Sequence, residues 1–177
     1  MTVYEVRLPL SVQEKITEEI FETAVNNPEG FVETGGWCWS PQGQAWWGDG
    51  LDIIEASGPG IGAERTYDTL FLPSDHLLDL DEMFRRDGLE LCGGWHLHPS
   101  GDQFPSELDL TRVGRVLDLR AIWESRTQRA IELIITREPK GEWTWCVTPW
   151  IFYRGPSGIL GTPGVHPEAA VLRLEEK

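Results

Sequence analysis

Basic residues and cysteine are scarce in this sequence, and each scarcity argues against a class of protein. Only 15 residues are Lys or Arg against 29 Asp and Glu, which sets the formal net charge at −14. Because phosphate binding relies on clustered cations, no nucleic-acid partner is expected. The three cysteines, Cys38, Cys92 and Cys146, are odd in number and far apart. Neither a disulfide framework nor a zinc knuckle of paired cysteines is therefore expected.

Long apolar runs and several familiar motifs are also missing. No apolar run reaches the roughly 18 residues that a membrane helix needs, and the first residues do not resemble a secretory signal. A cytoplasmic location with no membrane partner is the expectation that follows. The HExxH motif of thermolysin-like proteases and the GKS or GKT ending of a phosphate-binding loop do not occur. Both of those chemistries are disfavoured.

Hydrophobic periodicity along the 177 residues predicts one α/β (α+β) domain. Alternating or β-branched runs predict strands over 2–10, 31–40, 44–57, 89–98, 129–138 and 142–153. Apolar residues at helical spacing predict helices over 11–27, 74–88 and 105–123, the first two opening with a serine. We expect these helices to flank a curved, mixed, mostly antiparallel sheet.

The connections and the domain limits can be predicted in outline. A Pro-Gln-Gly turn between the runs 31–40 and 44–57 favours an antiparallel hairpin, and the several glycines of 58–69 favour a loop. The domain is assigned to residues 1–155. Residues 156–177 are expected to form an irregular tail with a short final element, packed on the same domain.

The stretch WHLHPSGDQFPSELD, Trp95 to Asp109, carries the strongest chemical signal. Side chains two apart on a strand share a face, so His96 and His98 project together. Ser106 and Asp109 are three apart at the start of a helix and share a face too. Because the intervening turn is short, two imidazoles and one carboxylate can converge at the end of the strand.

The same alternation makes predictions for the neighbours of the histidines. Leu91 and Trp95 should lie on the opposite, apolar face of the strand. Gly94 should lie beside the histidines, where its missing side chain is expected to leave open space. Cys92 falls on the histidine face but roughly 13 Å from His96, too far to complete a site.

Three N and O ligands with a fourth position open to water describe a catalytic zinc site. Each part also has a structural reading, because S-x-x-D is close to a helix capping box and a pair of histidines on a strand need not bind metal. The conjunction of HxHP, Ser106 and Asp109 favours the metal site with one Zn²⁺ per chain. Ser106 can cap its helix and still face the metal.

The string HLHPSGDQFPSELD resembles the JAMM, or MPN-plus, signature of zinc-dependent isopeptidases, H-x-H-P-x6-S-x-x-D. Over roughly residues 1–155 the resemblance implies a single MPN/JAB-like domain with a cytidine-deaminase-like layout. It implies that His96, His98 and Asp109 bind zinc and that Ser106 donates a hydrogen bond to the oxyanion. In this family an early strand carries an essential glutamate, often as E-x-x-G, and FVETGGWCWS supplies Glu33 as the general base.

The surrounding residues, GGWHLHP and the upstream GPGIGAER, look most like bacterial JAB-domain isopeptidases. Leu97 departs from the Ser or Thr that the family often has between the histidines, but it should face the core. The resemblance implies a ubiquitin-like protein or its conjugates as substrate. Ubiquitin-activating-like and ubiquitin-conjugating-like enzymes of one pathway, antiphage pathways included, are implied partners.

Two other functions stay open at the level of sequence. Some relatives of this fold have lost the metal ligands and act as non-catalytic scaffolds. A general zinc peptidase or amidase acting on small substrates would need the same ligands. Metal content separates the scaffold from both enzymes, and the substrate separates the enzymes from each other.

Overall fold

The computed structural model describes residues 4–28, 30–43, 50–122, 129–137, 145–154 and 165–174. Its helices are α1 (Leu10–Asn26), α2 (Ser74–Arg86) and α3 (Glu107–Ile122). Its longer strands are β2 (Gly35–Pro41), β7 (Leu89–His98), β8 (Arg129–Arg137) and β9 (Trp145–Arg154). The shorter strands are β1 (Glu5–Leu8), β3 (Gly50–Asp52), β4 (Glu55–Ala56), β5 (Glu64–Arg65), β6 (Leu70–Phe71), β10 (Val165–Ala169) and β11 (Val171–Leu174).

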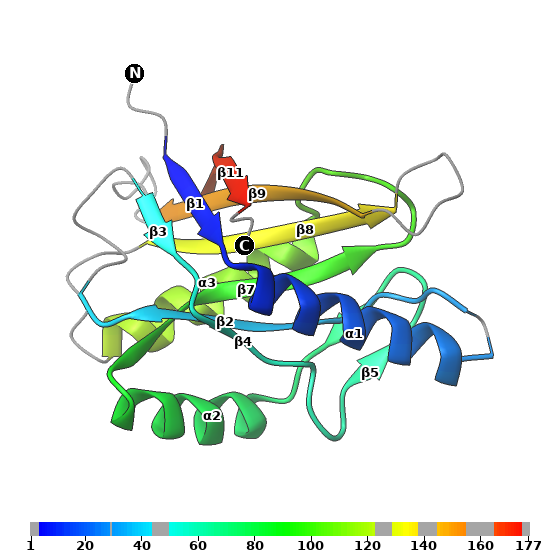
Figure 1. Cartoon of the computed structure of the whole chain (residues 1–177), viewed down its shortest axis with the longest axis horizontal. Coiled ribbons are helices and arrows are strands. Elements are labelled where there is room, and N and C mark those ends of the chain that lie inside the picture. The colour runs from blue at the N-terminus through cyan, green and yellow to red at the C-terminus, as the bar shows by residue number, and fades with distance from the viewer. Residues whose placement is uncertain are drawn as a thin grey trace, which may run out of the picture.

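The central sheet has the strand order β10-β9-β8-β7-β2-β4 (Figure 1). Neighbouring strands run antiparallel except β7 and β8, which are parallel. A second, parallel sheet has the order β11-β1-β3. The predicted α/β class with a mixed, mostly antiparallel main sheet is therefore confirmed.

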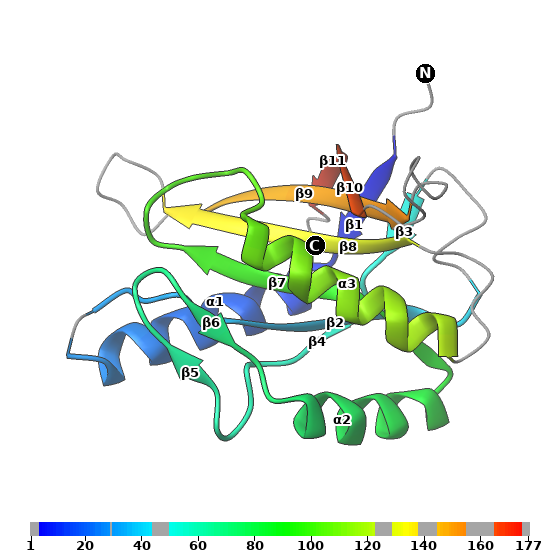
Figure 2. The same ribbon diagram turned by 180° about the vertical axis from the view of Figure 1, so that it is seen from behind.

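Helices cover both faces of the central sheet. Helix α1 lies across one face (Figure 1), and α3 lies across the other (Figure 2). On the first side, Ile16 and Ile20 of α1 share a buried core with Trp95 of β7. On the second side, Val113 of α3 shares a separate core with Leu77 of α2. Each helix buries one apolar stripe against the sheet, as its periodicity predicts.

All three predicted helices form, and α2 begins at Ser74 as predicted. Helix α1 begins at Leu10, one residue before the predicted Ser11, and α3 begins at Glu107, two residues after the predicted Pro105. The residues that precede α1 and α2, Pro9 and Pro73, are extended and provide no side-chain cap. A proline ring suits this position because it lacks an N–H group that would need a partner. No helix in the described parts of the chain is long and apolar enough to cross a membrane.

The predicted hairpin of 31–40 with 44–57 is wrong in its second half. Within the described part of 44–57, β4 pairs with β2 through two residue pairs, while β3 pairs in parallel with β1 in the other sheet. Leu51 and Ile53 are fully buried in the core on the α1 side. Burial of these side chains explains why this segment joins β1. Residues 44–49 lie outside the described residues.

Two segments expected to be irregular contain strands. The glycine-rich stretch 58–69 contains β5, which pairs with β6 in a small hairpin. In the tail, β10 pairs with β9 and β11 pairs with β1. Strand edges leave backbone groups that need partners, and these tail strands satisfy them. In its described part, residues 165–174, the tail therefore extends both sheets.

Candidate metal centre

The histidine strand β7 contains an irregularity that the alternation argument missed. In its pairing with β2, Cys38 lies opposite Gly93 and Trp39 lies opposite Leu91, so Cys92 is an extra residue in β7. Such a β-bulge shifts the side-chain alternation by one position. The predicted faces are therefore wrong on the N-terminal side of Gly93.

The cores on the two faces show the consequence of this bulge. Cys92 packs in the core on the α1 side, together with Trp95 and Leu97. Leu91 packs in the core on the α3 side. The Cys92 sulfur lies 3.2 Å from the backbone oxygen of Cys38. The conclusion that Cys92 is no ligand holds, because it faces away from the histidines as well as lying far from them.

Gly94 does not leave open space beside the histidines. A Cβ placed on Gly94 would lie 2.8 Å from the backbone oxygen of Gly36 and 3.2 Å from Oε2 of Glu132. Glu132 stands opposite Gly94 on the parallel strand β8. The space that the missing side chain provides is thus occupied by the Glu132 carboxylate.

Three side chains converge at the C-terminal end of β7. His96 Nε2 lies 2.6 Å from His98 Nε2 and 3.1 Å from Asp109 Oδ1. The other carboxylate oxygen, Asp109 Oδ2, lies 3.3 Å from His98 Nε2. All three residues are buried, and their ligand atoms lie within 4.8 Å of one another. The structure confirms that the motif brings these groups together in a cluster that can hold a metal ion.

The start of α3 positions the carboxylate of this cluster. The backbone N–H of Ser106 donates to Asp109 Oδ2 at 2.7 Å, and the backbone N–H of Asp109 donates to Ser106 Oγ at 3.2 Å. This reciprocal pair is a capping box. The other carboxylate oxygen of Asp109, Oδ1, faces His96. Capping and site-forming roles therefore coexist in Asp109, and Ser106 is exposed at the rim of the cluster.

Each imidazole has a hydrogen-bonding partner at Nδ1, the ring nitrogen that faces away from the centre of the cluster. His96 Nδ1 lies 2.7 Å from Glu132 Oε1, and His98 Nδ1 lies 2.7 Å from the backbone oxygen of Asp102. When Nδ1–H donates to such an acceptor, the lone pair of Nε2 points away from it. In the neutral form of each ring the Nε2 lone pair then faces the centre of the cluster, as metal binding requires. In the protonated form the same Nε2 atoms donate to Asp109.

Two of the three spacings in the cluster fit the ligands of a tetrahedral zinc ion. Ligands with bonds of roughly 2.0–2.1 Å to such an ion stand roughly 3.3 Å apart. The two distances from Asp109 to the histidines are 3.1 and 3.3 Å, whereas the two Nε2 atoms are 2.6 Å apart. The carboxylate already stands at ligand spacing, and the histidines need to separate by several tenths of an ångström to admit the ion.

The electrostatics of the cluster keep its carboxylate ionised. Burial raises the pKa of Asp109, but hydrogen bonds from His96 and His98, together with the charges of His96 and Arg112, hold that pKa well below its ordinary value of 3.8. Burial lowers the pKa of His98, but its bonds to Asp109 and Asp102 leave that pKa above 6.5. The aspartate thus presents a charged oxygen ligand near neutral pH.

Glu33 lies beside the cluster but just outside a strand. It was expected on an early strand, and β2 begins two residues later at Gly35. Its backbone N–H donates to Thr66 O at 2.8 Å, which ties it to the turn of the β5–β6 hairpin. Burial raises the pKa of the half-buried Glu33, and the charges of His96 and His98 act to lower it. Glu33 is therefore electrostatically coupled to the cluster without belonging to its ligand group.

The segment that carries Glu33 is anchored through its neighbour Thr34. The backbone N–H of Leu97 donates to Thr34 O at 2.7 Å, and Thr23 of α1 contacts the Thr34 hydroxyl at 3.3 Å. Arg65 of β5 donates to the Thr23 hydroxyl at 3.2 Å. These contacts hold the Glu33 segment between β7, α1 and the small hairpin.

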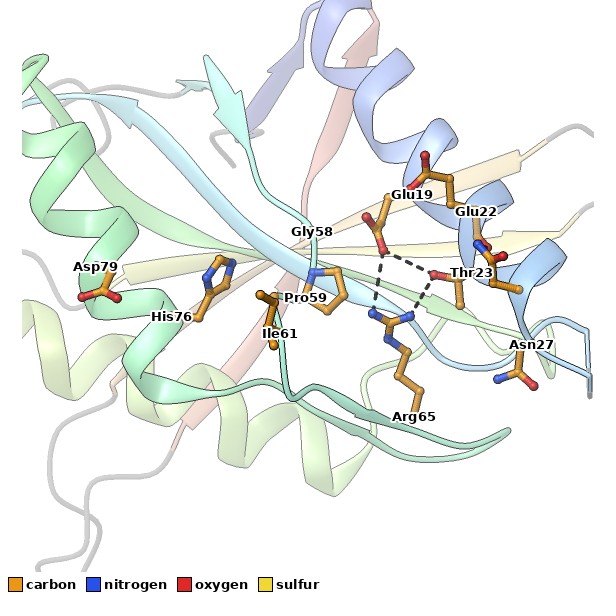
Figure 3. A pocket seen from close by; sticks show the side chains of 12 residues that line it. Glu19, Glu22, Thr23, Asn27, Gly58, Pro59, Ile61, Arg65, His76 and Asp79 are labelled. Atoms are coloured by element: carbon orange, nitrogen blue, oxygen red, sulfur yellow. Dashed lines mark hydrogen bonds and ion pairs between the residues drawn. The ribbon is translucent and has the colours of Figure 1, made fainter.

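A pocket of about 760 Å³ lies between α1, the loop before β5 and the start of α2. Figure 3 shows Arg65 pointing from β5 toward Glu19 and Thr23 on its wall, with His76 on the opposite side. None of the three clustered ligand residues lines this pocket. The pocket and the candidate metal centre are therefore separate features, and the contacts of Arg65 with Thr23 and of Thr23 with Thr34 lie between them.

Two residues of the site were missed at the level of sequence. Glu132 is the one acidic residue in the otherwise apolar run AIELII of β8, and it is 1% exposed. Arg112 stands one helical turn after Asp109, and its Nη2 donates to Asp109 Oδ1 at 3.0 Å and to Glu132 Oε1 at 2.7 Å. A lone charge in a buried strand was the available signal, because such a charge needs a partner.

Comparison of this chain with protein-family models gives no match, and comparison with curated proteins gives none either.

Proposed function

We propose that this protein is a JAMM-type zinc metalloprotease that hydrolyses the isopeptide or peptide bond after the C-terminal tail of a ubiquitin-like protein. The observation that carries the proposal is the buried convergence of His96, His98 and Asp109 within 4.8 Å. It coincides with the full H-x-H-P-x6-S-x-x-D spacing of the resemblance. The MPN/JAB-like domain with its cytidine-deaminase-like layout belongs to the same proposal.

The ligand set favours a catalytic over a structural metal site. Two imidazole nitrogens and one carboxylate leave a fourth position open, whereas structural zinc sites usually have four protein ligands. Zn²⁺ held there by His96, His98 and Asp109 would supply Lewis-acid chemistry and would lower the pKa of water. A non-catalytic scaffold would have no use for this arrangement of buried, charged ligands.

Glu33 and Ser106 supply the proton transfer and the oxyanion stabilisation that the hydrolysis of an amide needs. Glu33 takes a proton from the attacking water and delivers it to the nitrogen of the leaving amine as the C–N bond breaks. Ser106 turns its hydroxyl from Asp109 Oδ2, which it contacts at 2.7 Å, toward the oxygen that gains charge. The raised pKa of Glu33, caused by burial, suits a group that both accepts and returns a proton.

The surroundings of the site favour an extended peptide as the substrate. The β5–β6 hairpin lies close to the histidines, because a Cβ on Gly35 would meet Leu70 of β6 at 2.7 Å and His96 Cβ at 2.9 Å. An extended tail can add to the edge of such a hairpin through main-chain hydrogen bonds. Small residues such as Gly or Ala are expected just before the scissile bond, because they let the main chain of the tail pass close to the metal.

The side chains around the site favour a protein over a small metabolite. Phe104 is 67% exposed in the turn after β7, and Leu108 is 61% exposed beside Asp109 at the start of α3. Exposed apolar side chains of this kind around a site provide contact area for a macromolecule. They favour a folded modifier ahead of a small amide.

The test uses a ubiquitin-like protein encoded beside this chain, fused through its C-terminal tail to a fluorescent reporter. Elemental analysis of the purified chain is expected to find about one zinc per chain. The wild-type protein is expected to release the reporter at the end of the tail, and Glu33→Gln is expected to retain zinc but not cleave. Replacing the last small residues of the tail with Val should reduce kcat/KM far more than changing the amine side.

Each alternative function predicts a different result in the same assay. A scaffold binds the modifier without stoichiometric zinc and without cleavage. A general peptidase or amidase cleaves short free peptides or small amides efficiently and leaves the fusion intact. Either result would remove the isopeptidase proposal.

A further inference from the structure

We infer that Glu132 and Arg112 form a positioning pair that fixes how His96 and Asp109 bind the metal ion. The inference rests on the proposed metal site and concerns two residues outside its ligand set. Neither side chain offers an atom to the ligand group. Both act through the ligands that they contact.

Glu132 lies in a buried part of the sheet, where a carboxylate without close partners would destabilise the fold. It lies in the middle of β8 between Ile131 and Leu133, which are both fully buried. The backbone of Gly94 on β7 leaves room for it, since a Cβ there would stand 3.2 Å from Glu132 Oε2. A charge removed from water in this way requires close partners. His96 and Arg112 are those partners.

The contact between Glu132 and His96 sets the orientation of the ring. A metal ion on Nε2 requires the proton of the neutral imidazole to sit on Nδ1. Two groups lie 2.7 Å from that Nδ1, Glu132 Oε1 and Arg112 Nη2. The arginine has no acceptor to offer. Glu132 is therefore the group that accepts the Nδ1 proton and strengthens Nε2 as a ligand.

Arg112 joins this carboxylate to the metal-binding carboxylate. Its Nη2 donates to Glu132 Oε1 at 2.7 Å and to Asp109 Oδ1 at 3.0 Å. The planar guanidinium lies between the two carboxylates and donates to both, so each has a hydrogen-bonding partner in a buried place. His96 and Asp109 are consequently held by one connected unit that spans β8 and α3.

His98 is supported in a different way, which provides a matched control. Its Nδ1 is held by the backbone oxygen of Asp102, at 2.7 Å. The side chain of Asp102 points elsewhere and accepts from the backbone N–H of Phe104 at 3.0 Å. Asp102→Asn and Glu132→Gln each remove one negative charge at nearly constant size next to a metal-binding histidine. Only the second of them removes the carboxylate that holds a histidine.

The experiment measures Zn²⁺ affinity of the full chain by competition with a chelator, together with the visible absorption of the Co²⁺-substituted protein. Glu132→Gln is expected to weaken Zn²⁺ binding about 10- to 100-fold, as loss of such a supporting group does. The Co²⁺ absorption bands should shift, because a neutral amide oxygen accepts the Nδ1 proton more weakly than a carboxylate and makes His96 a weaker ligand. Asp102→Asn should leave both the affinity and the bands unchanged.

Two further measurements separate positioning from a general structural role. Thermal unfolding without metal is compared between Glu132→Gln and wild type, and a matching Tm with weaker Zn²⁺ binding supports positioning. Nitrogen NMR of the zinc-loaded wild type should show the His96 proton on Nδ1. If Glu132→Gln does not fold, Arg112→Lys replaces it, because an ammonium keeps the charge but cannot reproduce the planar guanidinium geometry. That variant should still bind Zn²⁺ several-fold more weakly.

The outcomes separate this inference from the proposed function. If the wild type binds no metal, both the proposed function and this inference are overturned. If the wild type binds Zn²⁺ and Glu132→Gln binds it equally well with unchanged Co²⁺ bands, only the positioning role is wrong. The same holds for unchanged affinity in Arg112→Lys when Glu132→Gln cannot be made.

Discussion

The pKa values of two carboxylates, Asp109 in the candidate metal centre and Glu19 on the wall of the pocket, depart from their ordinary values in opposite directions, although both side chains are partly removed from water. Burial raises the pKa of each. At Asp109, two histidine hydrogen bonds and the charge of Arg112 reverse the effect, and its pKa falls well below 3.8. At Glu19, the charge of Arg65 and a hydrogen bond from Thr23 lower the pKa by less than burial raises it, so the pKa stays above 4.5.

The distances explain the difference between these two regions. Arg65 Nη2 stands 4.0 Å from Glu19 Oε1, and the Thr23 hydroxyl stands 3.3 Å from it. Around Asp109 the two imidazoles and the Arg112 guanidinium stand at 3.0 to 3.3 Å, and the carboxylate is 3% exposed. The pocket also carries acids, a histidine and an arginine. Converging ligand atoms, and not residue types alone, distinguish the metal centre from the pocket.

The largest expected effect comes from removing histidines in one region and not in the other. The double variant His96→Ala with His98→Ala should lose stoichiometric zinc and all hydrolysis, because a single carboxylate cannot hold the ion. His76→Ala, in the pocket, should keep both. Elemental analysis and the reporter assay measure the difference. Full metal occupancy in the double variant would show that the ligand assignment is wrong.

Next in size is the comparison of two half-buried glutamates. Glu33→Gln should retain zinc and lose turnover by on the order of 10²- to 10⁴-fold, because an amide cannot move a proton. Glu19→Gln makes the same chemical change in the pocket and should keep wild-type turnover. Steady-state kinetics with zinc-loaded proteins test this. Equal activity in the two variants would deny Glu33 its role as general base.

A smaller loss is expected from the hydroxyl at the rim. Ser106→Ala should reduce turnover by on the order of 10²- to 10³-fold, as removal of one oxyanion donor does. It should also destabilise the protein by about 1 kcal/mol, because Ser106 Oγ accepts from the Asp109 backbone N–H at 3.2 Å. Ser100→Ala removes a hydroxyl from the adjacent turn and serves as the control. A loss of stability without a loss of turnover would leave Ser106 as a cap only.

The smallest effect concerns stability and its dependence on pH. Because the pKa of Glu19 is raised above 4.5 in the folded state, the unfolded chain ionises first as the pH rises. The contribution of Glu19 to stability is complete below 4.5 and is lost as the pH passes its folded pKa. Glu19→Gln should therefore gain stability relative to wild type between acidic and neutral pH. Denaturant unfolding at both ends of this range tests the sign, and a relative loss at neutral pH would contradict it.

Sequence reasoning located the site residues better than it located their surroundings. The strand Leu89–His98 and the helix that carries Asp109 were predicted, and the structure brings their ligand atoms together. Glu33 was predicted by resemblance and lies near the cluster, ahead of its strand. The role of each residue, and the metal itself, stay predictions. Glu132 and Arg112 were not predicted. Glu132 contacts residues that are distant in sequence, and the contact of Arg112 with Asp109 within α3 looks like an ordinary ion pair along a helix.

The sequence by itself determined the positions of the helices and main strands, and the spacing of three residues that can bind a metal, His96, His98 and Asp109. These are local properties, since side-chain direction repeats along each element. Tertiary structure alone decided that β3 leaves the hairpin for β1, that the bulge at Cys92 reverses the faces of β7, and that Glu132 fills the space beside Gly94. Each of these depends on which strand becomes a neighbour and what it must bury, and no local pattern contains that information.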